Sequence, residues 1–311
     1  MAVPFFSAGA VEAAVTPERA YEAVQQAFVA HARGQWTMQP KLYVTNYPAG
    51  DFRAMPALGG GHALLKWVTS FPGNPEHGLP TVSGLVVLSD ASTGLVEALL
   101  DAGAVTALRT GAAATLAAET LGARGGTASV IGVGVNGRAA ARSLKAQGRQ
   151  VELWDVDRER ARAVAAELGV GVATSQEEAL AASVVVTVTP GKQILLGPGT
   201  LRPGQHVSLM GADGPGKAEI AVEEIARARV FCDEWEQASH GGELAAAVEA
   251  AALGRSDVTE LGAVLIGEAE GRRSAHEITV FDSTGLAIQD LAVAIAAYAR
   301  AAELELPQLD L

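Results

Sequence analysis

Apolar and polar positions follow two distinct patterns along the chain, and the change between them divides the sequence. Thr16 and Pro17 suit the start of a helix, and apolar residues then recur at helical spacing, which predicts a helix over residues 17–32. The short apolar runs that follow are separated by Pro-, Gly- and Asn-rich turns, and they predict a mixed or antiparallel sheet. The expected strands are Lys41 to Thr45, Phe52 to Met55, Ala63 to Phe71, Val82 to Ser89 and Leu95 to Leu100.

The second pattern begins after a helical run from Ala104 to Leu121. Short apolar strands then alternate with helical runs, as they do in a doubly wound parallel sheet. We expect the closing helix, Gly285 to Glu303, to pack back on the first region, so that this region is discontinuous. The expected strands are Ser129 to Val133, Val151 to Trp154, Ser183 to Val188, His206 to Met210, Val230 to Cys232 and Ile278 to Phe281, and the expected helices are Arg158 to Leu168, Val222 to Arg227, Gly242 to Ala252 and Glu260 to Ile266.

Three glycines beside the first of these strands carry the clearest chemical signal. Gly132 permits a tight turn, Gly134 lets backbone approach a pyrophosphate, and Gly137 lets the next helix pack on the strand. Free N–H groups and the positive dipole end at the helix start would hold phosphate charge. Asp155, 21 positions after Gly134, ends the second strand where a dinucleotide-binding unit keeps its ribose-binding acid. The alternative is a Gly-rich turn in some other α/β protein.

Composition narrows the class of protein. With 311 residues the chain suits two domains, and its 49% hydrophobic content fits helices packed on a buried sheet. A formal net charge of −12 without a Lys/Arg cluster argues against nucleic acid or an anionic membrane as partner. The single cysteine, Cys232, excludes an intramolecular disulfide, and no His or Cys spacing suggests a metal site. No basic segment precedes the N-terminal apolar residues and no uncharged run is long enough for a membrane helix, so we expect a cytoplasmic protein.

Three charged residues in unusual surroundings are candidates for chemistry. Lys66 lies in an apolar strand, where a buried lysine needs a partner or a purpose, although an edge-strand lysine with its head in water fits equally well. Arg109 lies in a helical run among small residues, where an arginine is more often solvated. Asp213 follows an apolar strand, at the edge where a doubly wound sheet binds ligands, and its alternative is an Asx turn before glycine.

These residues belong to an ordered set of segments: MPALGGGHALLK, FPGNPEHGLPTVSG, ALRTGAAATLAA, GVGVNG, GADGPGKAE and VFDSTGLAIQDLA. Together they resemble the ornithine cyclodeaminase and mu-crystallin family from about Met38 to Ala299. The resemblance implies an α/β protein with a discontinuous α+β substrate-binding and dimerisation domain, residues 1–120 with 286–311, and a Rossmann domain, residues 121–285. It also implies a homodimer.

The resemblance assigns roles to the candidate residues. It implies that Lys66 and Arg109 grip the substrate α-carboxylate, that Thr81 and Arg109 approach the nicotinamide, and that Asp213 donates and accepts the proton. Further dinucleotide contacts are implied for Val135, Asn136, Thr187 and Ser283, beside Gly132, Gly134, Gly137 and Asp155.

Two positions depart from the family pattern and bear on the substrate. Where members usually carry a carboxylate-binding arginine after a proline, this chain has Lys41, which supplies charge but no bidentate fork. Where ornithine-using members carry a glutamate for the distal ammonium, this chain has Arg53, which would repel that ammonium. We therefore expect a small 2-amino acid, a cyclic imine acid or a substrate with a second carboxylate.

The expected activity is hydride transfer between a nicotinamide cofactor and the Cα of a small amino acid or imine acid. Asp155 favours NAD because a carboxylate bonds the ribose 2′-OH and repels a 2′-phosphate, while Arg158 and Arg160 nearby leave NADP open. One alternative is a cyclodeaminase that uses bound NAD catalytically and releases ammonia. Another is a non-catalytic, mu-crystallin-like ligand-binding protein.

Overall fold

The computed structural model describes residues 2–123, 125–212, 214 and 216–311. The chain forms two compact units: unit 1 comprises Met1–Arg109 and Leu286–Leu311, and unit 2 comprises Thr110–Gly285. The division falls inside helix α3 (Ala102–Leu121), whereas the sequence placed a domain boundary at the end of that helix. The substrate-binding and dimerisation roles expected for the first domain stay predictions.

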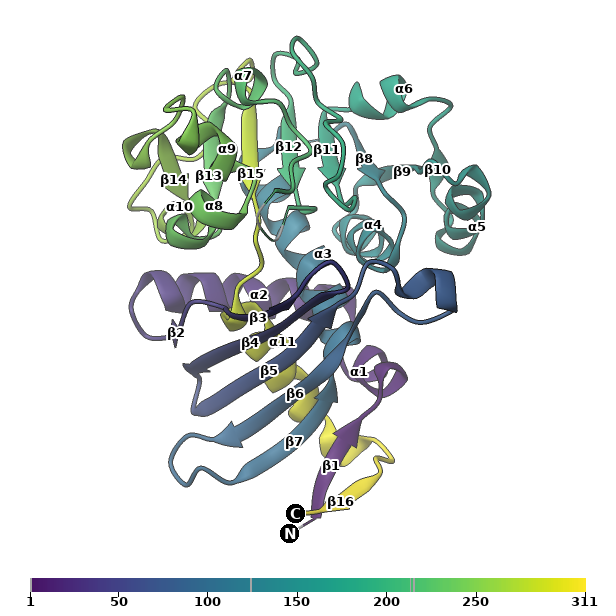
Figure 1. The fold of residues 1–311 in the computed structure, drawn as a ribbon, viewed down its shortest axis with the longest axis vertical. Helices are drawn as coiled ribbons and strands as arrows, with labels where there is room; N and C mark the ends of the chain where they lie inside the picture. Colours follow the sequence, from purple (N-terminus) through teal and green to yellow (C-terminus); the bar gives the residue numbers. More distant parts are fainter. Residues whose placement is uncertain (1, 124, 213, 215) are drawn as a thin grey trace. The chain divides into compact units, whose positions relative to one another are not determined.

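Unit 1 is built on a mixed sheet in the order β16-β1-β7-β6-β5-β4-β2, with β3 pairing with β4 off this path. Its β4 to β7 strands pair antiparallel, while β1 runs parallel to β7, so the expected mixed sheet is confirmed. The sequence missed β1 and β16, which pair with each other near the two ends of the chain (Figure 1). The described strands are β1 (Ala2–Phe6), β2 (Thr37–Met38), β3 (Leu42–Asn46), β4 (Gly50–Gly59), β5 (His62–Ser70), β6 (Val82–Asp90), β7 (Val96–Asp101) and β16 (Gln308–Asp310).

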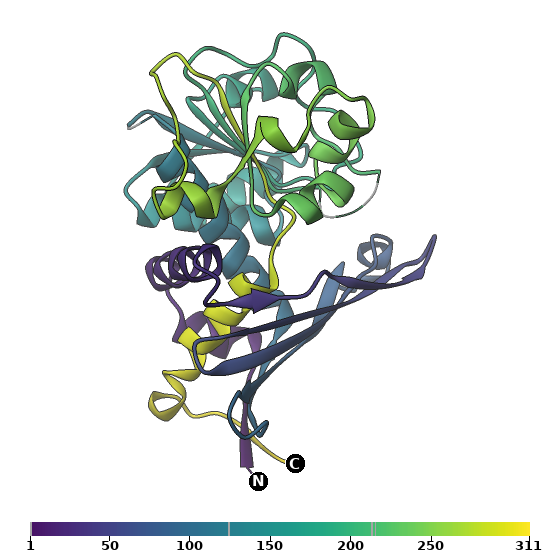
Figure 2. The ribbon, with the colours of Figure 1, turned by 90° about the vertical axis from the view of Figure 1, so that its left-hand side faces the viewer.

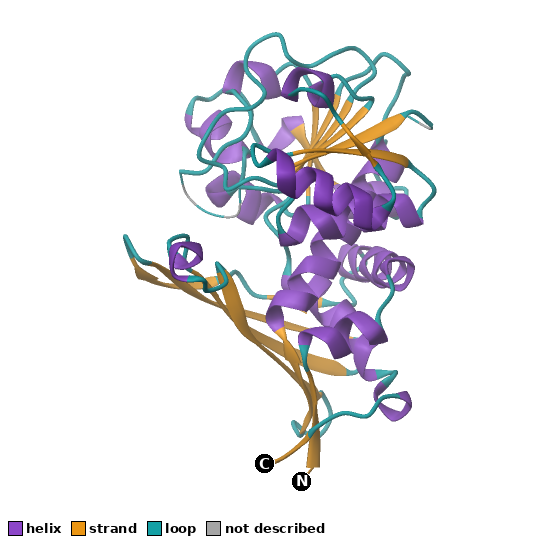
Figure 3. Cartoon of the chain, turned by 90° about the vertical axis from the view of Figure 1, so that its right-hand side faces the viewer, coloured by secondary structure: helices purple, strands orange, loops and turns teal. Residues whose placement is uncertain are grey.

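Helices cover one face of this sheet. Helix α11 (Ala287–Tyr298) packs on β4 and β5 and on α2 (Pro17–Ala32), and α1 (Ala8–Ala14) packs on β7. Figures 2 and 3 show these helices on a single side of the sheet, with the opposite face bare. Helix α2 has the predicted bounds because Thr16 caps its first turn and its apolar residues face inward. Two 3-10 turns, Asn74–His77 and Ala301–Glu303, complete the unit.

Unit 2 contains the expected doubly wound parallel sheet, in the order β10-β9-β8-β11-β12-β15-β13-β14. Every strand pairing described in it is parallel, and its central strands are buried along their whole length, which requires helices on both faces. The order reverses between β8 and β11, the place where such sheets bind ligands. The described strands are β8 (Thr127–Ile131), β9 (Gln150–Trp154), β10 (Gly171–Val172), β11 (Val184–Thr187), β12 (His206–Leu209), β13 (Arg229–Cys232), β14 (Val258–Glu260) and β15 (Thr279–Asp282).

The helices of unit 2 follow the predicted alternation, but the sequence missed the short helices α6 and α8, and one predicted helix has different bounds. The helix expected from Gly242 to Ala252 is present as α9 but is shorter, Leu244–Glu249, because Gly242 is extended at φ −101° and ψ −166°. A Cβ at Gly242 would lie 2.4 Å from Asp282 Oδ2, which also accepts the Leu244 N–H, so packing against Asp282 breaks the helix. The helices are α4 (Val135–Ala146), α5 (Arg158–Leu168), α6 (Gln176–Leu180), α7 (Val222–Ile225), α8 (Trp235–Gly241), α9 (Leu244–Glu249) and α10 (Leu261–Leu265), with a 3-10 turn at Arg255–Asp257.

The closing helix is shorter than the sequence suggested. It begins at Ala287 rather than Gly285 and ends at Tyr298, before the final 3-10 turn. Across the described residues, no helix combines the length and the apolar character that crossing a membrane requires.

Candidate dinucleotide and substrate-binding sites

The turn between β8 and α4 needs its three glycines for the reasons that the sequence predicted. Gly132 has φ 90°, and a Cβ there would lie 2.7 Å from the Val188 carbonyl oxygen at the end of β11. A Cβ at Gly137 would lie 1.8 Å from the Gly132 carbonyl oxygen, so only glycine lets α4 pack this closely on the turn. Gly134 has no atom within 4 Å of its Cβ position, which leaves its backbone open to a ligand.

The start of helix α4 is free to bind a phosphate. Gly134 is the N-cap and offers no side chain, so no capping side chain competes for the first N–H groups of the helix. Val135, the first helical residue, is 73% exposed. Uncapped N–H groups at the positive end of a helix, beside an open glycine, fit the pyrophosphate of a dinucleotide.

Asp155 is fixed at the end of β9. Its Oδ2 accepts the N–H of Val133 at 2.7 Å, and its Oδ1 accepts the N–H of Asp157 at 2.8 Å. The carboxylate is buried and lies 3.7 Å from Arg160. Each oxygen has a second lone pair, so the group can still accept a ribose hydroxyl. The hydrogen bond from the Val133 N–H fixes the position of the Asp155 carboxylate relative to the glycine turn.

The two arginines that left NADP open both have partners within unit 2. Arg158 donates to the Ala173 carbonyl at 2.6 Å. Arg160 donates to Asp157 at 3.0 Å, with its side chain half exposed. These contacts hold both guanidinium groups within unit 2, and each group keeps further N–H donors.

In unit 1, Lys66 is buried in the middle of the sheet. Strand β5 lies between β4 and β6, and Lys66 is 1% exposed, so the edge-strand alternative is wrong. Its Nζ donates to Asp290 Oδ1 at 2.8 Å, and Arg109 Nε lies 3.4 Å from the same oxygen. Burial lowers the pKa of Lys66 to about 8, opposed by the Asp290 charge and helped by Arg109 and Arg53. The structure thus brings together the two cations that the sequence singled out.

Arg53 shares the helix-covered face of the sheet with Lys66. Met55 pairs with Lys66 across the two strands, and Arg53 is two residues before Met55, so both cations point to the same side. Arg53 is buried and donates to Asp51 through Nε at 2.5 Å and Nη2 at 3.2 Å. A buried cation matched by a carboxylate therefore occupies the position where ornithine users carry a glutamate.

Sequence reasoning missed Asp290, Gln289 and Asp51. Gln289 Oε1 accepts from Arg109 Nη1 at 3.4 Å and from the Leu286 N–H at 3.3 Å, and both Gln289 and Asp290 are fully buried. The sequence feature that could have identified Gln289 and Asp290 is the presence of an amide and an acid in an otherwise apolar closing helix, AIQDLAVAIAAY. A buried acid there requires a cation from elsewhere in the chain.

Two expected cofactor contacts have their hydroxyls directed at buried acids. Thr187 Oγ1 donates to Glu219 at 2.6 Å, and Ser283 Oγ donates to Asp233 at 3.2 Å. Glu219 also accepts from Thr189 and from the Gly211 N–H, so it joins the ends of β11 and β12. The dinucleotide roles of Thr187 and Ser283 stay predictions.

The remaining expected residues are less constrained. Thr81 precedes β6, is half-buried, and accepts the Phe71 N–H through its carbonyl at 2.8 Å. Lys41 precedes β3 and is half-buried. Asp213, the expected proton donor, lies outside the described residues. Within the part of the chain that the structure describes, no group of three His, Cys, Asp or Glu side chains is arranged to hold a metal.

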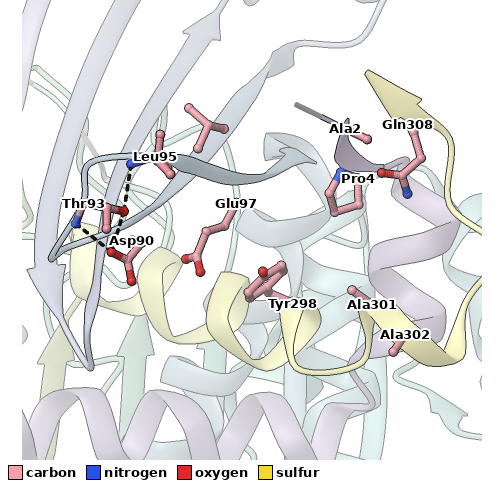
Figure 4. Close-up of a pocket in the computed structure, with 11 residues that line it drawn as sticks. Ala2, Pro4, Asp90, Thr93, Leu95, Glu97, Tyr298, Ala301, Ala302 and Gln308 are labelled. Atoms are coloured by element: carbon pink, nitrogen blue, oxygen red, sulfur yellow. Dashed lines mark hydrogen bonds between the residues drawn. The ribbon is translucent and has the colours of Figure 1, made fainter. Parts of the chain in front are cut away.

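A separate hollow of about 550 Å³ lies in unit 1 between the β6–β7 turn and the end of α11 (Figure 4). Asp90 and Glu97 line it, beside Tyr298 and Gln308. Both carboxylates are engaged, since Asp90 accepts from Ser92 and Thr93 and Glu97 contacts His62 at 2.7 Å.

A doubly wound sheet with this glycine turn and fixed acid defines a dinucleotide-binding α/β protein, here joined to a unit with buried cations. The chain belongs to the ornithine cyclodeaminase/mu-crystallin family, whose model matches residues 4–305. It is 42% identical over 301 residues to the alanine dehydrogenase of Archaeoglobus fulgidus, covering 94% of this chain and 92% of that one. It is 34% identical over 296 residues to the iminosuccinate reductase of Paracoccus denitrificans, covering 90% and 91%.

Among solved structures, an archaeal alanine dehydrogenase dimer with bound NAD has the same fold. Its TM-score is 0.94 at 38% identity, over 100% of this chain and 99% of that chain. The expected family and fold class are both confirmed.

Proposed function

We propose that this protein is an NAD-dependent oxidoreductase that transfers hydride between nicotinamide and the Cα of a small amino acid or the corresponding imine acid. The observation that carries the proposal is the pair of cations, Lys66 and Arg109, held on one buried carboxylate oxygen in a chain that also has a dinucleotide turn. The relatives named alanine dehydrogenase and iminosuccinate reductase support the same reaction class.

The residues of unit 1 would bind and orient the substrate. Arg109 offers a planar fork and Lys66 a point charge, and together they suit one α-carboxylate. Holding that carboxylate fixes Cα in one orientation, which hydride transfer requires. Bound NAD supplies or accepts the hydride. Asp213 is our candidate to protonate the imine or leaving amine and to remove a proton in the reverse direction.

NAD is the proposed cofactor because of Asp155. Its carboxylate is buried, ionisable and fixed by two backbone N–H groups, so it can accept the 2′-OH of the adenosine ribose. A 2′-phosphate would place like charge against it in a poorly solvated position. Arg158 and Arg160, the nearby cations, donate through Nη2 to Ala173 and Asp157.

The surroundings of Lys66 favour a small substrate over ornithine or lysine. Arg53 and Asp51 form a buried ion pair on the same sheet face. Position 53 therefore holds a cation, and not a carboxylate that could bind a distal ammonium. A second amino group brought near Arg53 would meet like charge. Alanine and other short 2-amino acids, their imines, and cyclic imine acids remain in the proposed substrate class.

We also propose that two copies of the chain form a homodimer, in which the bare face of the unit 1 sheet is the interface. Successive cross-strand neighbours place large apolar side chains on that face, each 42–62% exposed: Leu42, Val44, Leu58, Leu65 and Trp67. An apolar patch of this extent on a sheet is typical of a protein–protein interface. The related alanine dehydrogenase structure is a dimer.

The test is a substrate panel run with purified protein and each nicotinamide cofactor. Oxo acids with ammonia, cyclic imine acids, short amino acids, ornithine and lysine would be followed by nicotinamide absorbance and by ammonia release. The proposal expects an absorbance change equal to substrate consumed, with NAD preferred. Ammonia release from ornithine without net cofactor change would instead establish the cyclodeaminase alternative, and cofactor binding without turnover would establish the non-catalytic one.

A further inference from the structure

We propose that Asp290 is a positioning residue of the substrate site, which keeps Lys66 charged and holds it beside Arg109 so that both cations can act on one carboxylate. This inference rests on the proposed function for its kinetic part. Its structural part concerns residues of unit 1 alone and is testable without turnover.

A single carboxylate joins three elements of unit 1. Lys66 comes from the central strand β5, Arg109 from helix α3, and Asp290 from the first turns of α11. Asp290 Oδ1 accepts from Lys66 Nζ at 2.8 Å and lies 3.4 Å from Arg109 Nε. Without a shared acceptor, the two positive groups would repel each other in a poorly solvated interior.

Lys66 cannot keep its proton through solvation. The side chain is 1% exposed, and burial of an ammonium favours the neutral amine. Two further cations face it, Arg109 from α3 and Arg53 from β4, and both also favour the neutral form. Asp51 is already engaged by Arg53, so Asp290 on α11 supplies the opposing charge that Lys66 needs.

The neighbouring amide completes the arrangement. Gln289 Oε1 accepts from Arg109 Nη1 at 3.4 Å while also accepting the Leu286 N–H at the start of α11. The guanidinium is thus approached from two consecutive residues of the helix, by Gln289 at Nη1 and by Asp290 at Nε. Lys66 uses one of its three N–H groups on Asp290, so a substrate carboxylate can take the others.

The direct test is an NMR titration of the lysine side chains. The chain has only five lysines, so isotope labelling at lysine Cε and a Lys66→Met variant assign the Lys66 signal. In the wild type we expect Lys66 to titrate near pH 8. In Asp290→Asn we expect the midpoint to fall by at least about one unit, because an opposite charge at this distance shifts a pKa by about 1–3 units.

The kinetic test uses the pH dependence of KM for the carboxylate substrate. In the wild type KM should rise above about pH 8, as Lys66 loses its proton. In Asp290→Asn the rise should begin at least about one unit lower, and at pH 8 KM should be at least about fivefold higher. Asp290→Glu, which keeps the charge, should restore most of the wild-type profile. A merely structural role would not move the onset pH.

Asp90→Asn is the matched control, because Asp90 is a half-buried acid of the same unit at the end of β6, where it accepts from Ser92 and Thr93. It should leave the Lys66 titration and the KM profile unchanged. An unchanged Lys66 midpoint in Asp290→Asn would overturn the inference. A wild-type midpoint below about 6, the range of lysines buried without a partner, would also overturn it, and that result needs no folded Asp290 variant. Absence of turnover in the wild type would overturn the proposed function while the titration still decides the role of Asp290.

Discussion

At the scale of single residues, several buried charged groups have partners that only the fold reveals, as Lys66 does in Asp290. Lys66 and Arg109 were found from the sequence because a charge inside an apolar run is visible locally. Asp290 was not, because its partner is 224 residues away and only the fold brings them together. Local pattern therefore identifies which residues need partners, and tertiary structure identifies the partners.

Asp155 gives the first residue-scale prediction. Asp155→Ala should raise the Kd of NAD by about tenfold and that of NADP by less, because only NAD loses a carboxylate–hydroxyl bond while NADP is relieved of repulsion. Loss of the hydrogen bond to Val133 affects the binding of both cofactors equally. The ratio of the two Kd values, measured by calorimetry, therefore reports only the effect of the Asp155 charge on the ribose group. An unchanged ratio would show that Asp155 does not contact the ribose.

His206 gives a prediction for acid stability. It is fully buried, its ring nitrogens contact Thr279 and Ser208 hydroxyls at 2.9 Å, and burial with help from Arg272 and Arg149 lowers its pKa to about 3. Between about pH 6.5 and 3, His206 is protonated in the unfolded chain but neutral in the folded protein. The free energy of unfolding therefore falls as pH drops from about 6.5 towards 3.

Replacing the His206 imidazole with a side chain that does not titrate should remove its contribution to the pH dependence of unfolding. His206→Gln should reduce the pH slope of the free energy of unfolding by up to about 1.4 kcal/mol per pH unit between pH 6 and 4. Urea unfolding at a series of pH values measures it. Equal slopes in the two proteins would mean that His206 is protonated in the folded state.

At the scale of elements, boundaries set by local signals were predicted well. Helix α5 spans Arg158–Leu168 as expected, because Asp157 caps its start and Gly169 ends it in the left-handed conformation. The β1–β16 pair was missed because its stabilisation comes from pairing between the two ends of the chain. The Gly242 helix break was missed because its cause is Asp282, 40 residues further on, which packs against that glycine.

The buried acid Glu243 connects two segments of unit 2 through hydrogen bonds. Both oxygens of Glu243, just before α9, accept the Glu219 N–H at 2.9 Å. Burial, with the nearby charges of Asp282 and Glu219, raises the pKa of Glu243 to about 9. The folded protein therefore holds a proton that the unfolded chain releases above pH 4.5, and stability is lost as pH rises from about 4.5 towards 9.

Glu243→Gln should relieve this loss, since glutamine is neutral at every pH and its amide oxygen can still accept the Glu219 N–H. We expect the variant to match the wild type near pH 5 and to show a flatter decline in the free energy of unfolding up to pH 9. Thermal unfolding across that range, with Glu249→Gln on the same helix as control, measures the difference. Parallel declines in wild type and variant would contradict a protonated Glu243.

At the scale of the whole molecule, the bare apolar face of unit 1 is the proposed contact between two copies of the chain. Trp67, on that face, is 42% exposed and stacks on Phe52 with ring centroids 5.8 Å apart. Trp67→Glu would place a charge in the proposed interface and should shift the protein from dimer to monomer. Light scattering during size-exclusion chromatography reports the mass, with exposed Leu95→Glu on the β6–β7 turn as control. A dimeric Trp67→Glu protein would exclude this face as the interface.

Net hydride transfer from substrate Cα to a cofactor that leaves the protein can be followed directly by isotope transfer. The protein would be incubated with NAD and short amino acids deuterated at Cα, and the nicotinamide released into solution would be analysed by mass spectrometry. We expect deuterium in the free reduced cofactor, in proportion to substrate oxidised. Label that returns to a cyclic product, or stays on unreacted amino acid across the whole panel, would contradict it.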